Sequence, residues 1–121
     1  MNYFNDNLKL NRIIASIVLA ISFMIYFLTM APTVSYWDCG EFIATSYILG
    51  VPHPPGSPLY LLLGRIFSMI PTNPDIAFRV NIISPIVSAV ACMLLYLIIV
   101  KIILQWRGKI KNNTDLLIAF G

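Results

Sequence analysis

The sequence predicts an all-α integral membrane protein, in which two transmembrane helices are joined by an extracytoplasmic loop with two short membrane-parallel helices. Of the 121 residues, 59% are hydrophobic and only 11% are charged, whereas soluble domains carry about 45–50% apolar and about 25% charged residues. Two long stretches, residues 13–31 and 80–100, hold no charged side chain. The net charge of +3 is not gathered into a basic stripe with interleaved aromatic residues, so we expect no nucleic-acid partner.

The first apolar stretch predicts a transmembrane helix over residues 13–31, preceded by a polar, cytoplasmic N-terminus at residues 1–12. As a helix this stretch is about 28 Å long, which is enough for a bilayer core of about 30 Å. A cleaved signal peptide is the alternative, but its apolar core would be about 7–15 residues long and would end in small residues. Bulky residues instead precede Met30 and Pro32, so a retained span is the preferred interpretation.

The two short helices are expected within the loop of residues 32–77. One helix is predicted over Trp37–Leu49, ended by Gly50 and Pro52, because glycine and proline interrupt helices. After a rigid turn at residues 53–58, a second helix is predicted over Leu59–Ile70. At about 20 Å it is too short to span a bilayer, so we expect it to lie in the interface or to pack against other spans.

The second apolar stretch predicts a transmembrane helix over residues 78–104. Asn73, Pro74 and Asp75 suit a helix start, with Asn73 as the N-cap, proline at the first helical position and an acid in the first turn. Pro85 lies inside this helix, and because proline removes a backbone hydrogen bond we expect it to kink the helix or restart it.

The positive charges indicate the orientation. Cations lie before the first span (Lys9, Arg12) and after the second (Lys101, Arg107, Lys109, Lys111), whereas residues 32–77 hold Arg65 against Asp38, Glu41 and Asp75. The positive-inside rule then places both ends in the cytoplasm and the loop outside. We expect an integral protein of the cytoplasmic (inner) membrane, with a cytoplasmic basic loop at residues 105–115. The apolar residues 116–121 predict the start of a third segment and therefore a longer protein.

Two carboxylates in the loop are the leading candidates for chemistry. On a helix, Asp38, Glu41 and Thr45 fall within an arc of about 60°, which suits a general base beside a second acid, or oxygen ligands for a divalent cation. Helix capping is the alternative, since Ser35 and Asp38, and likewise Asp38 and Glu41, have capping-box spacing. The sequence pattern alone leaves both interpretations open.

Three further polar side chains in or next to the loop have a structural and a functional interpretation each. His53 could be a structural residue that donates to a loop carbonyl, or it could meet a substrate. Arg79 could pair with Asp75 one helical turn away or bind a lipid phosphate, whose oxygens match the guanidinium fork. Arg65 could extend its charge to the membrane surface or serve the same phosphate.

The two segments APTVSYWDCGEFIA (31–44) and LGVPHPPGSPLY (49–60) resemble a particular family. This is a bacterial-type family of large polytopic membrane proteins, formerly of unknown function and related to the protein O-mannosyltransferases of the GT-C glycosyltransferase superfamily. The specific feature is the D-x-G-E element followed by H-P-P-G. The resemblance implies that the chain is the N-terminal part of a larger GT-C-like bundle.

The resemblance also implies an activity. GT-C enzymes take a sugar from a polyprenyl-phosphate carrier, and the mannosyltransferases pass it to Ser or Thr of exported proteins. Asp38 would then be the general base with Glu41 as its partner, and His53, Arg65 and Arg79 would bind substrate. The better-known mannosyltransferases have adjacent acids, whereas two residues intervene here, which leaves open which acid is the base. No cofactor is implied, although two acids could hold a divalent metal.

This interpretation has two competitors from other functional classes. A transporter or flippase-like protein would use the acids as a proton or substrate relay, but such a protein should carry acids within its spans. A non-catalytic membrane scaffold would use the loop for assembly. As partners of the transferase we expect membrane lipid, the lipid-linked donor, an exported protein acceptor and the remaining spans of a longer chain, without which this portion would not catalyse.

Overall fold

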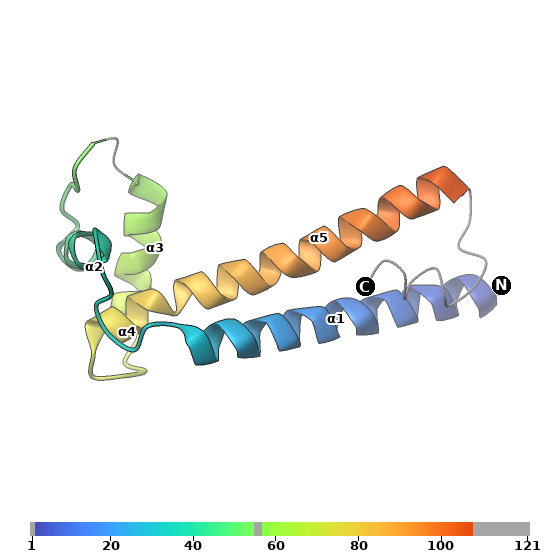
Figure 1. Ribbon diagram of the computed structural model, residues 1–121, viewed down its shortest axis with the longest axis horizontal. Helices are drawn as coiled ribbons and strands as arrows, with labels where there is room; N and C mark the ends of the chain where they lie inside the picture. The colour runs from blue at the N-terminus through green and yellow to red at the C-terminus, as the bar shows by residue number, and fades with distance from the viewer. Residues whose placement is uncertain (1, 55–56, 108–121) are drawn as a thin grey trace. The chain divides into compact units, whose positions relative to one another are not determined.

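The structure, a computed structural model, describes residues 2–54 and 57–107, and over these residues helix is the only regular secondary structure, as predicted. The helices are α1 (Asn2–Thr29), α2 (Cys39–Ile48), α3 (Pro58–Met69), α4 (Ile76–Asn81) and α5 (Ile83–Arg107) (Figure 1). The expected apolar segment at 116–121 and most of the basic loop at 105–115 lie outside the described residues. Two helical stretches, Leu8–Thr29 and Ile76–Ile103, are long and apolar enough to cross a bilayer.

The described residues form two compact units, and the first comprises residues 2–25 and 87–107. In it α1 and α5 lie side by side and antiparallel (Figure 1). Tyr96 of α5 is buried against Ile14 and Ala15 of α1, and its hydroxyl donates a 2.9 Å hydrogen bond to Oδ1 of Asn11. Only 11% and 17% of the most apolar windows of the two candidate spans are buried. Most of their apolar surface is therefore open to lipid or to further helices.

The second unit comprises residues 26–86 and contains α2, α3 and α4. Its core is built from apolar residues of α2, α4 and the start of α5: Ile43, Ala77, Val80 and Ile83. α2 and α3 meet closely where Gly64 faces Ser46, which is fully buried. A side chain at position 64 would place its Cβ only 2.7 Å from that of Ser46, so the absence of a side chain permits this contact.

α2 is shorter than predicted at both ends. It begins at Cys39 because Trp37 adopts a left-handed conformation with φ 67°. It ends at Ile48 because Leu49, with φ 54° and ψ 40°, takes the left-handed position that glycine usually occupies. The Gly50 amide then donates to the Thr45 carbonyl at 2.8 Å. The predicted end is thus correct to within a residue, but the residue that reverses the chain is Leu49.

The N-cap predicted at Asn73 is wrong. Asp75 is the N-cap of α4, and its Oδ1 accepts a 2.8 Å hydrogen bond from the amide of Ala77. Oδ1 of Asn73 instead accepts from the amide of Asp75 at 2.9 Å. This Asx turn uses the fixed φ of Pro74 in the connection, so the helix begins two residues later than a cap at Asn73 would allow.

The predicted interruption near Pro85 is present, but it lies earlier in the chain. α4 ends at Asn81, Ile82 separates the two helices, and α5 begins at Ile83. Pro85 has no amide hydrogen, so the carbonyl of Asn81 loses the donor it would have in a continuous helix. The amide of Asn81's own side chain donates at 3.0 Å to the carbonyls of Ala31 and Thr33, and so ties the start of the loop to α4.

Candidate active site

Asp38 lies at the N-cap position of α2, but its side chain makes no capping hydrogen bond. Only its backbone carbonyl joins the helix, accepting from the amide of Phe42 at 3.0 Å. The Ser35 hydroxyl, which a capping box would direct to the backbone, lies 3.6 Å from Sγ of Cys39. The Asp38 carboxylate, about half exposed, is therefore available for a role other than capping.

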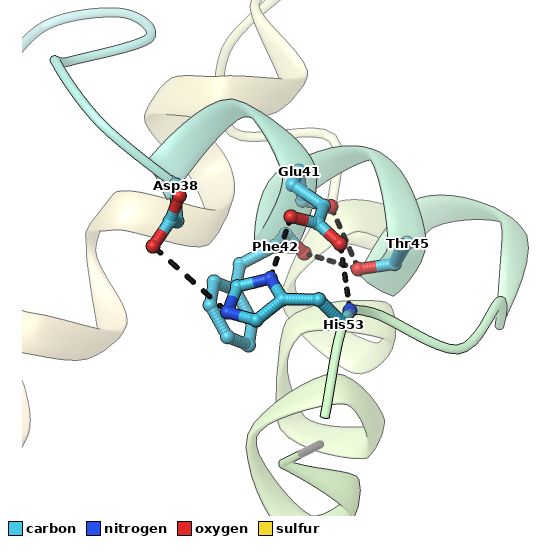
Figure 2. A network of polar contacts seen from close by, with 5 residues as sticks. All are labelled: Asp38, Glu41, Phe42, Thr45 and His53. Atoms are coloured by element: carbon cyan, nitrogen blue, oxygen red, sulfur yellow. Dashed lines mark hydrogen bonds and ion pairs between the residues drawn. The ribbon is translucent and has the colours of Figure 1, made fainter. Parts of the chain in front are cut away.

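Glu41, one turn further along α2, binds His53 twice (Figure 2). Its Oε1 accepts a 2.8 Å hydrogen bond from the backbone amide of His53. Its Oε2 lies 2.8 Å from Nδ1 of the same residue. An ionised carboxylate can only accept, so Nδ1 carries the hydrogen of this second bond. Both oxygens of Glu41 are thus engaged by one residue of the loop that follows α2.

The other ring nitrogen of His53 faces Asp38. Nε2 lies 4.0 Å from Oδ2 of Asp38, the outer limit for an ion pair (Figure 2). The ring also packs edge-on against Phe42, with centroids 5.9 Å apart, and Phe42 packs in the same manner against Tyr60 of α3 at 5.8 Å. The imidazole is therefore held on one side by Glu41 and on another by an aromatic pair.

These contacts change the proton affinities of the pair. The side-chain hydrogen bond from His53, followed by its backbone hydrogen bond, lowers the pKa of Glu41 below the ordinary 4.5. The same side-chain bond, followed by the charge of Glu41, raises the pKa of His53 above the ordinary 6.5, and Asp38 adds a smaller effect of the same sign. The imidazole consequently keeps its positive charge to a higher pH than a free histidine.

Thr45 does not join the acids, although its position on the helix predicted that it would. Its hydroxyl donates to the carbonyls of Glu41 at 2.7 Å and Phe42 at 3.3 Å (Figure 2). The third member of the cluster is His53, which the sequence alone did not place beside Glu41. The signal that could have indicated it is the reversal of the chain at Leu49 and Gly50 followed by the rigid proline-rich turn.

The two arginines occupy a different part of the second unit. They line a cavity of about 460 Å³ between α2, α3 and α4. Arg65 donates to the carbonyl of Tyr47, and its guanidinium carbon lies 5.5 Å from the centre of the Tyr47 ring. Arg79 donates through Nε to the carbonyl of Asn73 and through Nη1 to that of Ser68 at 3.0 Å. Each guanidinium has five N–H groups, so both retain donors for a ligand.

The alternative in which Arg79 pairs with Asp75 is not realised among the described residues, because the Asp75 carboxylate caps α4 while the Arg79 guanidinium binds carbonyls.

A divalent cation is another possibility at the acid cluster. Asp38, Glu41 and His53 offer ligand atoms within 4.8 Å of one another. However, the raised pKa of His53 favours its protonated ring, and a ring with hydrogens on both nitrogens has no lone pair for a cation. The arrangement fits a proton-handling site better than a metal site.

Comparison with known proteins gives a consistent match. Residues 38–120, which include all five candidate site residues, match the family model described as the N-terminal domain of protein O-mannosyl-transferase TMEM260. The chain is 40% identical over 93 residues to a Dictyostelium discoideum protein named protein O-mannosyl-transferase tmem260, a match covering 74% of this chain and 11% of that protein. It is 36% identical over 72 residues to the Mus musculus protein of the same name, covering 60% of this chain and 10% of that protein.

The match covers a small part of the relatives and includes no solved structure. The aligned part of the chain spans only about a tenth of the length of these relatives, and no solved structure matches. Both relatives are eukaryotic, so the expected relation to O-mannosyltransferases is supported, whereas the bacterial-type assignment is not.

Proposed function

Because the chain belongs to the TMEM260 N-terminal domain family, described as that of a protein O-mannosyl-transferase, we propose that it is the N-terminal portion of a membrane glycosyltransferase. The transferase moves mannose from a polyprenyl-phosphate carrier to Ser or Thr hydroxyls of exported proteins. The structural observation that carries the proposal is the state of Asp38, a carboxylate at a helix start that caps nothing and faces a histidine.

The proposed topology follows from the charges and the two apolar helices. In this topology the two spans are Leu8–Thr29 and Ile76–Ile103, which are long and apolar enough to cross a bilayer. The cation-poor connection between them is assigned to the extracytoplasmic side by the positive-inside rule. α2 and α3 then lie near the outer membrane surface, with α3 along it. This placement brings the acid cluster to the side on which exported acceptors and a lipid-held donor can meet.

In the proposed reaction Asp38 is the general base. A Ser or Thr hydroxyl is a weak nucleophile, and it needs its proton removed as its oxygen bonds to C1 of the sugar. Asp38 takes that proton. The bond between C1 and the phosphate oxygen breaks at the same time, and its electron pair leaves with the lipid phosphate. The exposed carboxylate of Asp38, which makes no bond to the helix amides, suits this role.

The lipid phosphate that leaves needs positive charge around it. Arg65 and Arg79 are proposed to bind it, since both line one cavity and each is already fixed by backbone carbonyls. A guanidinium that is fixed in advance loses less side-chain freedom when it binds an anion. His53 completes the set of substrate-facing residues beside Asp38.

The test uses the full-length protein with Asp38→Asn and measures mannose on secreted acceptor proteins, together with the membrane level of the enzyme. Asp75→Asn is the matched control, because it makes the same chemical change at a helix cap, where asparagine also caps well. We expect Asp38→Asn to abolish transfer and Asp75→Asn to preserve it, both at normal membrane level.

Other outcomes would contradict the proposal in distinct ways. Unchanged transfer by Asp38→Asn would mean that this acid is not the base. Failure of Asp38→Asn to reach the membrane, with Asp75→Asn normal, would favour the scaffold. A wild-type protein that transfers no mannose to any acceptor would overturn the transferase assignment itself.

A further inference from the structure

The two acids of the site are not equivalent, and their hydrogen bonds show the difference. Asp38 makes no helix-capping bond and lies 4.0 Å from Nε2 of His53. Glu41 uses one oxygen for the backbone amide and the other for the ring of His53, each at 2.8 Å. Both oxygens of Glu41 are thus already hydrogen-bonded, whereas the carboxylate of Asp38 makes no hydrogen bond among the described residues and has all its lone pairs open to a substrate hydroxyl.

We propose that Glu41 is a positioning residue that acts through His53, and that Asp38 and Nε2 of His53 form the pair that meets the substrates. This assignment rests on the proposed function and decides which acid is the base. Glu41 holds the imidazole by Nδ1, so the ring presents Nε2 toward Asp38, while Phe42 restricts the ring from another side. The backbone bond from His53 to Glu41 fixes the turn that carries the ring.

The electrostatics agree with this division of roles. Two N–H groups on the Glu41 oxygens favour its ionised form and lower its pKa, which makes it a poorer proton acceptor. A carboxylate of this kind serves better to hold a histidine in one orientation and tautomer, as second-layer carboxylates do for metal-binding histidines. In the transfer step the acceptor proton therefore goes to Asp38, and Glu41 neither gains nor loses a proton.

The test is a double-mutant cycle in the full-length enzyme, with kcat and the acceptor KM measured for Glu41→Gln, His53→Asn and the double variant. Glu41→Gln keeps an oxygen for the His53 backbone amide but replaces the carboxylate at the ring. His53→Asn keeps a donor near the Nδ1 position and removes Nε2. Carboxylates that orient metal-binding histidines are worth about 10- to 100-fold. We expect a loss of the same order in kcat for Glu41→Gln, with the acceptor KM unchanged.

The decisive measurement is the kcat of the double variant. If Glu41 acts through His53, the double variant has the kcat of His53→Asn alone, because nothing remains to be positioned. If the two losses multiply instead, Glu41 has its own contact with substrate and the inference is wrong.

A second variant keeps the test valid if Glu41→Gln does not fold. His53→Gln leaves Glu41 untouched and places an amide near the Nε2 position. The inference expects it to lose kcat as His53→Asn does, whereas near-normal kcat would contradict it. Asp38→Asn, measured alongside, separates the two proposals: if it is inactive while the cycle is multiplicative, only the role given to Glu41 fails.

Discussion

Glu41 and His53 are joined by two hydrogen bonds of 2.8 Å, one to the backbone amide and one to the ring of the histidine. The pair links the first turn of α2 to the loop that follows the same helix. A carboxylate in the first turn usually serves the helix dipole. Here it also holds the backbone and the ring of His53 and raises the pKa of the imidazole, and this dual contact gives the first prediction.

The pKa of His53 should be higher than that of an ordinary histidine and should fall when Glu41 is replaced by glutamine. The hydrogen bond from the ring to Glu41 and the charge of Glu41 both raise it, and glutamine removes the charge. A histidine NMR titration of the full-length protein in detergent measures it, with the His53 signal identified by its absence in His53→Asn. Equal titration midpoints in wild type and Glu41→Gln would contradict the prediction.

The same pair should make the order of the turn depend on pH at both ends of its range. Because the pKa of His53 is raised, the stabilisation of the turn by the charged imidazole is complete below about pH 6.5. It is lost as the pH rises through the higher pKa of the folded state. Because the pKa of Glu41 is lowered, the stabilisation of the turn by the ionised carboxylate is complete above about pH 4.5. It is lost as the pH falls through the lower pKa of the folded state. Hydrogen exchange at the His53 amide should therefore be slowest, after correction for intrinsic rates, between these limits, and a flat profile would contradict this.

Local sequence signals predicted most of the helices. Apolar runs, the helix start at Pro58 and the helix stop at Gly50 and Pro52 act over a few neighbouring residues, so the predicted bounds of α2 and α3 were correct to within two residues at each end. The N-cap of α4 was not predicted correctly, because Asn73 and Asp75 are both good N-cap residues and the Asx turn decides between them.

The composition of the site was only partly predictable. Asp38 and Glu41 could be chosen from their charge beside an apolar run, but the partner of Glu41 could not. Twelve positions separate Glu41 from His53, and their contact depends on the chain reversing after α2. Helical periodicity favoured Thr45 instead, whose hydroxyl has a nearer acceptor in the backbone of its own helix.

Arg79→Lys should destabilise the second unit more than Arg65→Lys. Arg79 is partly buried and donates from two nitrogens to two carbonyls, those of Ser68 and Asn73, and a lysine ammonium cannot reproduce that fork. Hydrogen bonds from charged groups are worth about 1.5–3 kcal/mol each, so losing one predicts a cost of about that size. Arg65 has one carbonyl and the Tyr47 ring as partners, both of which lysine can use. Thermal denaturation in detergent compares the two, and equal losses would argue against the fork.

Gly64→Ala should destabilise the packing of α2 on α3. The new Cβ would lie 2.5 Å from the Ser46 hydroxyl and 2.7 Å from its Cβ, and Ser46 is fully buried. Overpacking of this kind costs about 1–3 kcal/mol. Gly50→Ala is the control, because its Cβ would meet the flexible end of Ile48 at 3.3 Å. A denaturation midpoint that falls for Gly64→Ala and holds for Gly50→Ala would agree; the reverse order would show that the helices do not approach at Gly64.

Asp75→Ala should weaken the start of α4, whereas Asp75→Asn should not. The carboxylate accepts the amide of Ala77 at 2.8 Å, and loss of such a cap costs about 0.5–2 kcal/mol, while asparagine caps nearly as well. The same comparison decides between the two possible caps, because Asn73→Ala removes the bond to the Asp75 amide without removing the cap itself. We therefore expect the thermal midpoint of the full-length protein to fall further for Asp75→Ala than for Asn73→Ala. The opposite order would return the N-cap to Asn73, as the sequence alone suggested, and would require α4 to begin earlier than Ile76.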